Sequence, residues 1–533
     1  MEAWVTALAA LSVFAVFKFL FRKQHKLPPG PLALPLIGNP IWLFKPLSEL
    51  ETILRHLHSK YGPVVTIHFG NTPSIFIASH SVSHHALVQN GAVFADRFPV
   101  METAKIITSN QHNISTAFYG PTWRILRRNL TSELPHPSRL KAHSPSRKWV
   151  LDLLIQRLLQ QSHPTSLPHA PLPVTLIDQL RYAMFCLAAA MCFGERFDTK
   201  LIEEIQESQR GVLLNVNKFN DLNFWPPKLG KILFRKRWDE LHQLRKRQDD
   251  VLLPLINARK KIVEEERDGK YFNPPKDEDA GNVKPIPYVD TLFDLEIVDD
   301  KNDEKRKRKL EEDELITLCS EFIDAVTDTT TVSLQWIMAN LVKYPDIQEK
   351  LFSEIKGVMG DKQKKEIEEE DLARMTYLKA VVLEGLRRHP PGHLLLPHKV
   401  TEDSVLEGGY MVPKGTSVNF MVADMGWDPK VWADPMAFKP ERFLMDSSDG
   451  GGVELEIDIT GSREIKMMPF GAGRRFCPGF ALGLLHLEYY VGNLVWNFKW
   501  TAAGDVDLLE KQESAITMKH PLLSHVSPRD ISN

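Results

Sequence analysis

Cysteine and net charge are both scarce in this chain. Its 533 residues include only four cysteines, which are not grouped as they are in a disulfide-stabilised secreted protein, so we expect a reducing compartment. Lys and Arg together number 66 and Asp and Glu number 68, which leaves a net charge of −2. A chain this balanced lacks the strong positive field that favours nucleic acid. We therefore expect neither a disulfide framework nor a nucleic-acid partner.

Charge is also nearly missing from the N-terminus, where residues 3–21 are apolar except for Thr6, Ser12 and Lys18. As a helix this run would span about 28 Å, close to the roughly 30 Å hydrocarbon core of a bilayer. Basic residues follow at positions 22, 23, 25 and 26, so the positive-inside rule puts the rest of the chain in the cytosol. We expect residues 1–21 to be an uncleaved, single-pass transmembrane anchor helix. A cleaved signal peptide and a helix lying on the membrane surface are the alternatives.

A proline-rich segment separates this run from the body of the chain. Residues 22–40 hold five prolines after the basic cluster. Proline fixes φ and stiffens the backbone, so we expect a semi-rigid hinge, with an ordinary loop as the alternative. The body of the chain then extends over residues 41–533.

Hydrophobic patterns in the body predict a mainly α fold with small β-sheets. Alternating apolar residues predict two strands, at 64–69 and 74–78. Helical periodicity is clearest in three stretches, residues 146–162, 235–265 and 311–343. The stretch 262–312 is rich in charge, in particular at 299–309, and we expect a solvated, mobile loop between two helices, with a partner-binding tail as the alternative.

The most informative segment surrounds Cys477, where residues 470–479 fit the pattern F-G-x-G-x-R-x-C-x-G. The glycines permit backbone angles closed to other residues and let amides approach the sulfur. Arg475 offers a fixed cation for a carboxylate, and the apolar run after Gly479 predicts a helix whose N-terminal end favours a thiolate. The pattern favours a cysteine that binds a metal from a fixed direction over a structural cysteine in a glycine-rich turn.

This loop resembles the cysteine-ligand loop of the cytochromes P450, and the chain resembles that family from end to end. Segments 119–124 and 336–345 make it most similar to the plant microsomal A-type, in particular the 89A subfamily. The resemblance implies the cytochrome P450 fold as one haem-thiolate catalytic domain over residues 41–533. It also implies haem b (iron protoporphyrin IX), with Cys477 as the axial ligand of the iron.

The implied reaction is that of a monooxygenase, which inserts one atom of O2 into an organic substrate. Electrons would come from NADPH through the flavin-containing NADPH–cytochrome P450 reductase. The catalytic domain would face the cytosol from the endoplasmic reticulum membrane.

The helix expected over residues 313–344 carries Ala325-Val326-Thr327-Asp328-Thr329-Thr330 near its middle. This resembles the family's Ala/Gly-Gly-x-Asp/Glu-Thr-Thr/Ser segment on the distal face of the haem, so Asp328 and Thr329 would deliver protons during oxygen activation. Val326 departs from the pattern, because the family usually has glycine there. A β-branched valine fills the space and resists a local bend, which puts rate and coupling in doubt.

Further motifs imply contacts with the haem or with the core. By family position Trp123, Arg127 and His398 would approach the haem propionates, and Phe470, Arg475 and Gly479 would complete the haem site. Arg124 and Arg128, on the same helix as Arg127, also suit docking of an acidic reductase. Glu384, Arg387 and Arg442 are expected to form a structural charge cluster that fixes the cysteine loop to the core.

The substrate pocket is expected to draw on four largely apolar segments, residues 98–118, 322–326, 393–396 and 515–518. Such a lining suits a mid-sized lipophilic substrate with one or two polar groups. The Asp328–Thr329 pair argues against a second class of enzyme, a haem-thiolate isomerase or dehydratase acting on a peroxide. A non-catalytic haem-binding protein is the third alternative. The sequons at Asn113 and Asn129 are expected to stay unmodified in the cytosol.

Overall fold

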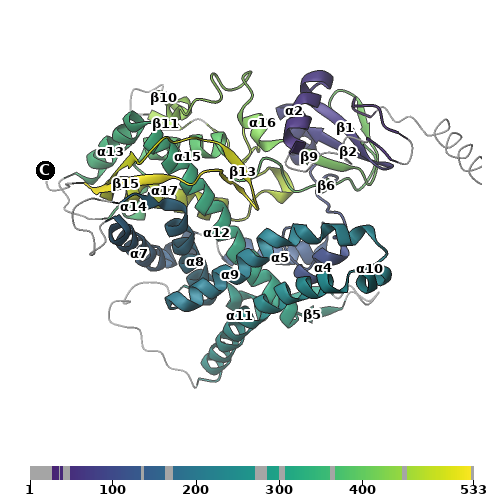
Figure 1. Cartoon of the computed structure of the whole chain (residues 1–533), viewed down its shortest axis with the longest axis horizontal. Helices are drawn as coiled ribbons and strands as arrows, with labels where there is room; N and C mark the ends of the chain where they lie inside the picture. Colours follow the sequence, from purple (N-terminus) through teal and green to yellow (C-terminus); the bar gives the residue numbers. More distant parts are fainter. Residues whose placement is uncertain are drawn as a thin grey trace, which may run out of the picture. The chain divides into compact units, whose positions relative to one another are not determined.

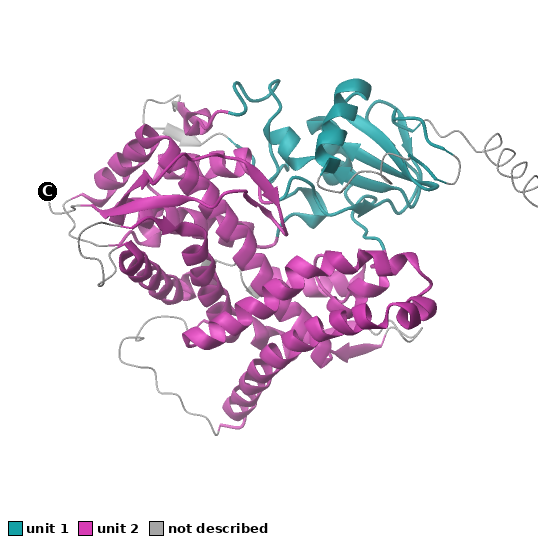
Figure 2. Ribbon diagram, viewed as in Figure 1, with its two compact units in different colours: residues 1–98, 392–436, 457–477 teal, residues 99–391, 437–456, 478–533 magenta. Residues whose placement is uncertain are grey.

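A computed structural model describes most of the chain, namely residues 27–34, 37–39, 49–133, 137–162, 172–269, 285–298, 306–360, 366–446, 453–455 and 457–529. The expected anchor, residues 1–21, and much of the expected hinge lie outside the described residues. The chain forms two compact units (Figure 2). Unit 1 comprises residues up to 98, 392–436 and 457–477, and unit 2 comprises residues 99–391, 437–456 and 478–533.

Unit 1 is built around a small sheet in the order β1-β2-β9-β6 (Figure 1). β1 pairs antiparallel with β2, β2 pairs parallel with β9, and β6 pairs antiparallel with β9. Its elements are α2 Leu50–Tyr61, β1 Val64–Phe69, β2 Thr72–Ile77, α3 His80–His84, the π-helix η3 His85–Gln89, β6 His398–Lys399, β7 Ser404–Leu406, β8 Tyr410–Val412, β9 Ser417–Phe420, α16 Val422–Gly426 and the 3₁₀ turn η8 Gly473–Arg475. The two predicted strands are β1 and β2.

The described part of the expected hinge lies along β1. The carbonyl of Pro29 accepts a hydrogen bond from the Thr66 amide at 2.9 Å, and Gly38 forms a bridge with Phe69. The side chain of Asn39 holds the turn by donating to the carbonyls of Pro31 and Leu32. This part of residues 22–40 is therefore docked on the sheet by backbone pairing.

The core of unit 1 joins this sheet to the segment that precedes Cys477. Ile75, Val418 and Phe420 are fully buried in one cluster with Met468 and Ala472. Because packed side chains hold their backbone in one arrangement, this cluster fixes the start of the cysteine loop.

Unit 2 is mainly helical and is crossed by the long helix α12, Glu312–Lys343, which packs against α8, α11, α15 and α17 (Figure 1). A capping box between Glu311 and Glu314 starts α12, and Pro345 begins the next helix. Three predicted helices are confirmed, as α7, α11 and α12. The helical elements are α4 Glu102–Ile107, α5 Pro121–Glu133, α6 Pro137–Ala142, α7 Ser144–Ser162, α8 Leu176–Phe193, α9 Thr199–Asn215, η4 Val216–Phe224, α10 Pro227–Leu233, α11 Arg235–Arg267, η6 Tyr288–Leu292, α13 Pro345–Met359, α14 Glu369–Leu372, α15 Thr376–Arg388, η7 Pro440–Phe443 and α17 Phe480–Asn497.

Within the described ranges, only α8 is long and apolar enough to cross a membrane. However, 83% of that stretch is buried inside the protein, and α8 packs between α7 and α12. It is accordingly a core helix of unit 2.

The strands of unit 2 are short and form four small sheets. They are β3 Val174–Thr175, β4 Glu296–Val298, β5 Lys307–Lys309, β10 Leu444–Asp446, β11 Val453–Leu455, β12 Phe498–Ala502, β13 Glu510–Gln512, β14 Ile516–Met518 and β15 Leu523–Pro528. β12, β15 and β3 form one sheet, and the others form the pairs β4–β5, β10–β11 and β13–β14.

The prediction of a continuous loop over residues 262–312 is wrong at the β4–β5 pair. Ile297 of β4 is fully buried, and Arg308 of β5 donates to the Glu314 carboxylate at 2.6 and 2.7 Å. The charged run thus supplies one ion-paired side chain to the start of α12, which its composition did not reveal. Residues 299–305 of this run lie outside the described residues.

Candidate functional site

The loop that ends at Cys477 is held by backbone hydrogen bonds and two left-handed glycines. The Cys477 amide donates to the Phe470 carbonyl at 2.9 Å, and the Phe476 amide donates to the Gly473 carbonyl at 3.1 Å. Gly471 and Gly473 have φ of 73° and 69°. A Cβ at Gly473 would lie 1.8 Å from the Leu87 carbonyl oxygen, so only glycine fits there. This close approach explains the glycine at 473, and the left-handed backbone explains the glycine at 471.

Cys477 differs from the other three cysteines in its exposure. Cys186, Cys192 and Cys319 are buried, whereas Cys477 is partly exposed. Burial raises the pKa of the Cys186 thiol to about 12 and that of Cys192 well above its usual range. Because the thiolate is the form that binds a metal, these two buried cysteines are unsuited to ligation.

Two arginines lie close to this loop within unit 1, of which Arg97 is buried and Arg475 is partly exposed. Arg475 donates to the Ala95 carbonyl at 2.8 Å, and His398 bonds through Nδ1 to the neighbouring Phe94 carbonyl at 2.5 Å. Burial, together with the positive charges of Arg97 and Arg475, lowers the pKa of His398 to about 3. His398 is thus neutral here, and its Nδ1–H donates a hydrogen bond to the Phe94 carbonyl. An approaching carboxylate would have to charge the ring before Nε2 could donate to it.

Arg97 was missed by the sequence reasoning. Its side chain is buried, donates to the carbonyls of Leu396 and Pro397 at 2.9 Å, and has its pKa lowered to about 10 by burial. Its position beside Asp96 in the otherwise apolar stretch 93–100 was the available signal, because a charged side chain is seldom buried unless it is paired.

The predicted site residues are divided between the two units. Unit 1 contains Phe470, Arg475, Cys477 and His398, and unit 2 contains Trp123, Arg127, Asp328, Thr329 and Gly479. Gly479 is the N-cap of α17, and its carbonyl accepts from the Gly483 amide at 2.8 Å. The helix predicted after the motif is therefore present.

Trp123 and Arg127 lie on one face of α5, as their spacing predicts. The guanidinium of Arg127 is 5.9 Å from the centre of the Trp123 ring. The buried Trp123 indole donates to the Ile114 carbonyl at 3.2 Å. Contact of this indole with a propionate stays a prediction and would require exchange of that hydrogen bond.

Asp328 and Thr329 lie side by side in α12, but their side chains bond to different elements. Asp328 accepts from Arg210 of α9 at 3.2 Å and from the Ser514 hydroxyl between β13 and β14. The Thr329 hydroxyl donates to the Ala325 carbonyl, one turn earlier, at 2.8 Å. Thr329 is exposed within unit 2. The Asp328 carboxylate is thus bonded to residues outside α12, whereas the Thr329 hydroxyl is bonded to the backbone of α12.

Val326, the departure from the family pattern, is buried, with 9% of its surface exposed. α12 continues as an α-helix through this position, which agrees with a β-branched residue that resists bending. Burial, and repulsion from Asp328, raise the pKa of the nearby Asp324 well above its usual range. The effect of Val326 on coupling stays a prediction.

The expected charge cluster of Glu384, Arg387 and Arg442 is present in unit 2. Glu384 and Arg387 of α15 are fully buried and form two hydrogen bonds, at 2.7 and 2.8 Å. Arg442 donates to the same carboxylate at 3.1 Å, and the Lys439 amide donates to it at 2.7 Å. Both arginines also donate to the Ala437 carbonyl at 3.3 Å. The cluster therefore fastens the segment around residues 437–442 to α15.

The asparagines of both sequons are buried in unit 2. Asn113 donates to Ser115 and Glu321, and Asn129 donates to Thr291 at 3.1 Å. Each asparagine has less than a tenth of its surface exposed. A glycan could not be attached to either amide without opening these contacts, which supports the expectation that neither is modified.

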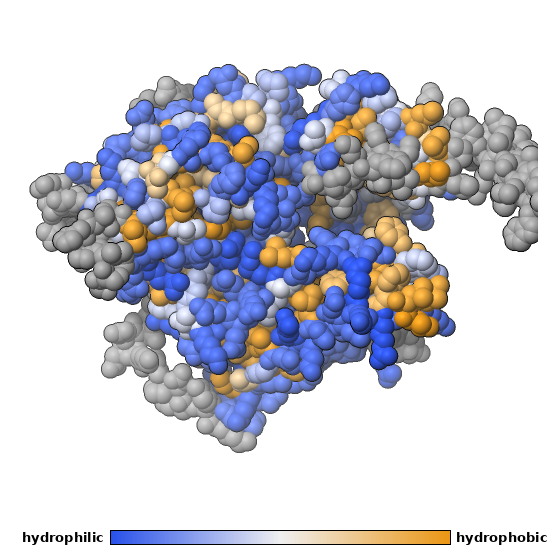
Figure 3. Space-filling view, in the orientation of Figure 1, coloured by the Kyte–Doolittle hydropathy of each residue, from blue (hydrophilic) through white to orange (hydrophobic). Residues whose placement is uncertain are grey.

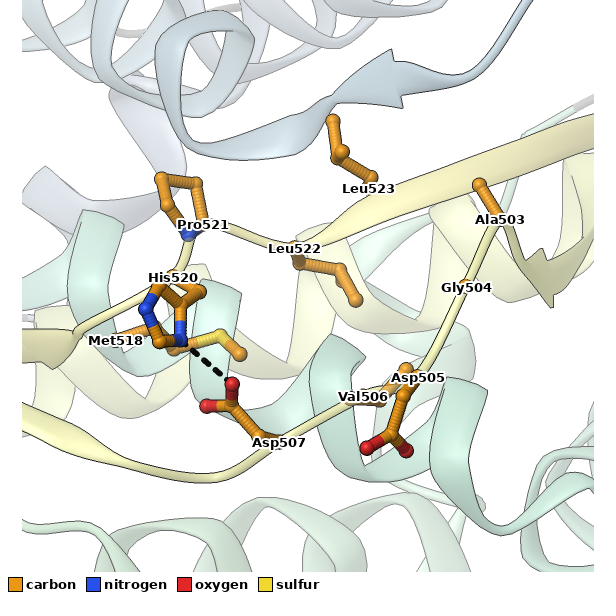
Figure 4. Close-up of a pocket in the computed structure, with 10 residues that line it drawn as sticks. All are labelled: Ala503, Gly504, Asp505, Val506, Asp507, Met518, His520, Pro521, Leu522 and Leu523. Atoms are coloured by element: carbon orange, nitrogen blue, oxygen red, sulfur yellow. Dashed lines mark hydrogen bonds and ion pairs between the residues drawn. The ribbon is translucent and has the colours of Figure 1, made fainter.

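A small pocket of about 160 Å³ lies beside the sheet of β12 and β15 (Figure 4). His520 and Asp507 form a hydrogen bond of 2.6 Å at its side, and Val506 and Leu522 are buried in its wall. Ligand pockets for drug-sized molecules usually occupy about 300–1,000 Å³, so this one is too small for the expected substrate. Among the described residues no group of three or more His, Cys, Asp or Glu side chains could hold a metal ion.

Comparisons with known proteins agree with the sequence and the geometry. A family model described as Cytochrome P450 matches residues 28–526. The chain is 49% identical to Cytochrome P450 89A9 of Arabidopsis thaliana, over 97% of this chain and 96% of that protein. It is 31% identical to Sugiol synthase of Salvia miltiorrhiza, over 90% of this chain and 89% of that protein.

Among solved structures, a zebrafish cytochrome P450 with progesterone superposes with a TM-score of 0.70 over 91% of this chain and 100% of that one. At 22% identity this likeness shows the fold alone. The resemblance to the 89A subfamily and the mainly helical fold with small sheets are both confirmed. The chain belongs to the cytochrome P450 family and is a monooxygenase with haem b as its cofactor.

Proposed function

We propose that this monooxygenase oxidises a lipophilic small molecule with O2, using electrons passed from NADPH through a flavin-containing reductase at the cytosolic face of the endoplasmic reticulum. The observation that carries the proposal is the cysteine loop. Among the four cysteines, Cys477 alone is partly exposed, at the end of a loop whose two left-handed glycines hold its backbone in one arrangement.

The residues present in unit 1 fit a haem. Cys477 offers a soft thiolate ligand for iron, and the buried Arg97 and the partly exposed Arg475 give a positive potential suited to the propionates. When bound, thiolate-ligated haem supplies the redox chemistry that cleaves O2, because the thiolate pushes electron density toward the iron.

On this proposal the remaining site residues hold the haem propionates in place or deliver protons to the oxygen site. Arg475 and Arg97 hold carboxylates, and by family position Arg127 of α5 would add a cation and Trp123 an indole N–H donor. Asp328 and Thr329 carry protons from solvent to the oxygen site, Asp328 as the acid and Thr329 as the hydroxyl that holds a water. Arg124 and Arg128 are exposed on α5, which supports docking of an acidic reductase.

Thr329→Ala tests this reaction class. Full-length protein with reductase and NADPH should consume O2, and the variant should release at least about tenfold more peroxide relative to water, because a proton-relay group commonly contributes a factor of 10²–10⁴. NADPH, O2 and peroxide are measured together. Turnover of an organic peroxide that needs neither NADPH nor O2 would instead support the isomerase or dehydratase. A difference-spectrum screen against lipophilic plant metabolites would then identify the substrate.

Membrane attachment is proposed to depend on residues 1–26, with a second contribution from the body. Unit 2 exposes large apolar side chains around α10, including Phe224 at 87% and Ile232 at 75%, and Figure 3 shows apolar residues gathered in the part of unit 2 that holds α10. Lys228 and Lys231 stand exposed among them. Apolar and basic residues together suit the surface of an anionic bilayer.

Deletion of residues 1–26 should therefore move much of the protein to the soluble fraction with its haem retained. The fraction of the protein that remains bound to the membrane should decrease further when Phe224→Asp and Ile232→Asp are added. Protease added to sealed microsomes should digest the body of the intact protein. Complete protection of the body in that experiment would show that the topology is inverted.

A further inference from the structure

The carboxylate of Asp328 is held at both oxygens by elements from outside its own helix. Oδ1 lies 3.2 Å from Arg210 of α9, and Oδ2 accepts from the hydroxyl of Ser514. Only 12% of the Asp328 side chain is exposed. An acid held by two partners has one preferred direction, and it cannot turn without losing a contact.

The turn that carries Ser514 is itself fixed to α12. The indole of Trp336 donates to the Ile516 carbonyl at 2.9 Å, and the Thr517 hydroxyl lies 3.3 Å from Gln335. The Ile516 amide of the same hairpin donates to the Pro391 carbonyl, beyond the end of α15, at 2.9 Å. The β13–β14 hairpin therefore lies along two turns of α12, with Ser514 toward Asp328.

The two contacts of Asp328 differ in strength. Arg210 is a cation, and it is also shared with Glu513 at 3.7 Å, so its bond to the carboxylate is charge-assisted. Ser514 is a neutral hydroxyl on an exposed residue, so its bond to the carboxylate is the weaker of the two. Because Arg210 bonds to Oδ1, the Ser514 hydroxyl is the contact that directs Oδ2.

We propose that Ser514 is a positioning residue for proton delivery: it fixes the direction of the Asp328 carboxylate and links it to the β13–β14 hairpin. The hairpin includes residues 515–518, which are expected to line the substrate pocket. A substrate that shifts the hairpin would thereby also shift the acid. This inference rests on the proposed role of Asp328 as the proton-delivering acid.

The partition of O2 between peroxide and water tests this without a known substrate. Formation of H2O2 consumes one NADPH and one proton per O2, whereas formation of two waters consumes two NADPH and two protons. Full-length haem protein, reductase and NADPH are combined, and NADPH, O2 and peroxide are measured. Loss of one hydrogen bond to a carboxylate should raise the peroxide-to-water ratio about fivefold to tenfold in Ser514→Ala.

Matched variants separate positioning from a general loosening of the hairpin. Ser514→Thr keeps the hydroxyl and should restore the wild-type ratio. Lys511→Gln removes the 2.8 Å ion pair of the same hairpin with Glu513 and should leave the ratio unchanged. A Lys511→Gln ratio equal to that of Ser514→Ala would overturn the inference.

Hydrogen exchange gives a readout independent of turnover. Amides of residues 513–515 should exchange faster in Ser514→Ala and in Asp328→Asn, and the double variant should be no faster than either single one. Additive effects would contradict a shared contact.

The two proposals fail in different ways. An unchanged peroxide-to-water ratio in Asp328→Asn, or a wild-type protein that yields only peroxide, would remove Asp328 from proton delivery. A changed ratio in Asp328→Asn with an unchanged ratio in Ser514→Ala would keep the acid and reject Ser514.

Discussion

Cys477→Ser is expected to abolish the thiolate signature of the haem in the reduced carbon-monoxide spectrum. A serine hydroxyl is not ionised near neutral pH and is a hard oxygen donor, so it cannot replace a soft thiolate on iron. The loop itself should survive, because its hydrogen bonds come from backbone groups of Phe470, Gly473 and Cys477. The expected result is a protein of wild-type secondary structure that retains little haem or shows an altered spectrum.

Cys319→Ala is the matched control for this experiment. Cys319 is fully buried in α12 and plays no part in the cysteine loop, so its removal should keep the thiolate spectrum at some cost in stability. A normal thiolate spectrum in Cys477→Ser would show that Cys477 is not the iron ligand. Loss of that spectrum in Cys319→Ala alone would show the same.

Local patterns in the sequence predicted the elements that frame the site. The apolar periodicity of α12 and of α17 is long enough to identify a helix, and the alternation in β1 and β2 identifies strands. The resemblance identified the cluster of Glu384, Arg387 and Arg442 before its geometry was known. Each of these signals lies within a short stretch of chain, or in motifs that occur in a fixed order.

Contacts between distant segments could not be predicted in this way. Arg97 bonds to carbonyls about 300 positions later, and Ser514 meets Asp328 from 186 positions away. The β4–β5 pair was hidden because its residues are mostly charged, and strand pairing depends on the backbone as well as on composition. Such contacts depend on how whole helices and strands pack together. Neither the spacing of motifs nor the charge pattern of the sequence predicts that packing.

Glu384→Gln is the second variant for which we expect a large effect, here on stability. The substitution removes the negative charge that faces the fully buried Arg387 and the largely buried Arg442. Breaking a buried ion pair by removing one partner commonly costs about 3–5 kcal/mol, because an uncompensated charge is left in the interior. Since a domain has only about 5–15 kcal/mol of stability, most of the variant should fail to accumulate as folded protein.

The effect of Glu384→Gln should far exceed that of removing a surface carboxylate. Glu370 pairs with Lys141 at 3.1 Å with both side chains mostly exposed, and such pairs contribute at most about 1 kcal/mol. Glu370→Gln should therefore unfold at nearly the wild-type denaturant concentration. Arg442→Lys weakens the 3.1 Å bond to Glu384 and the 3.3 Å bond to the Ala437 carbonyl but keeps the positive charge, so it should fall between the two and remain folded enough to measure. Equal unfolding midpoints for Arg442→Lys and Glu370→Gln, with Glu384→Gln fully folded, would show that this cluster does not hold α15 to the segment around residues 437–442.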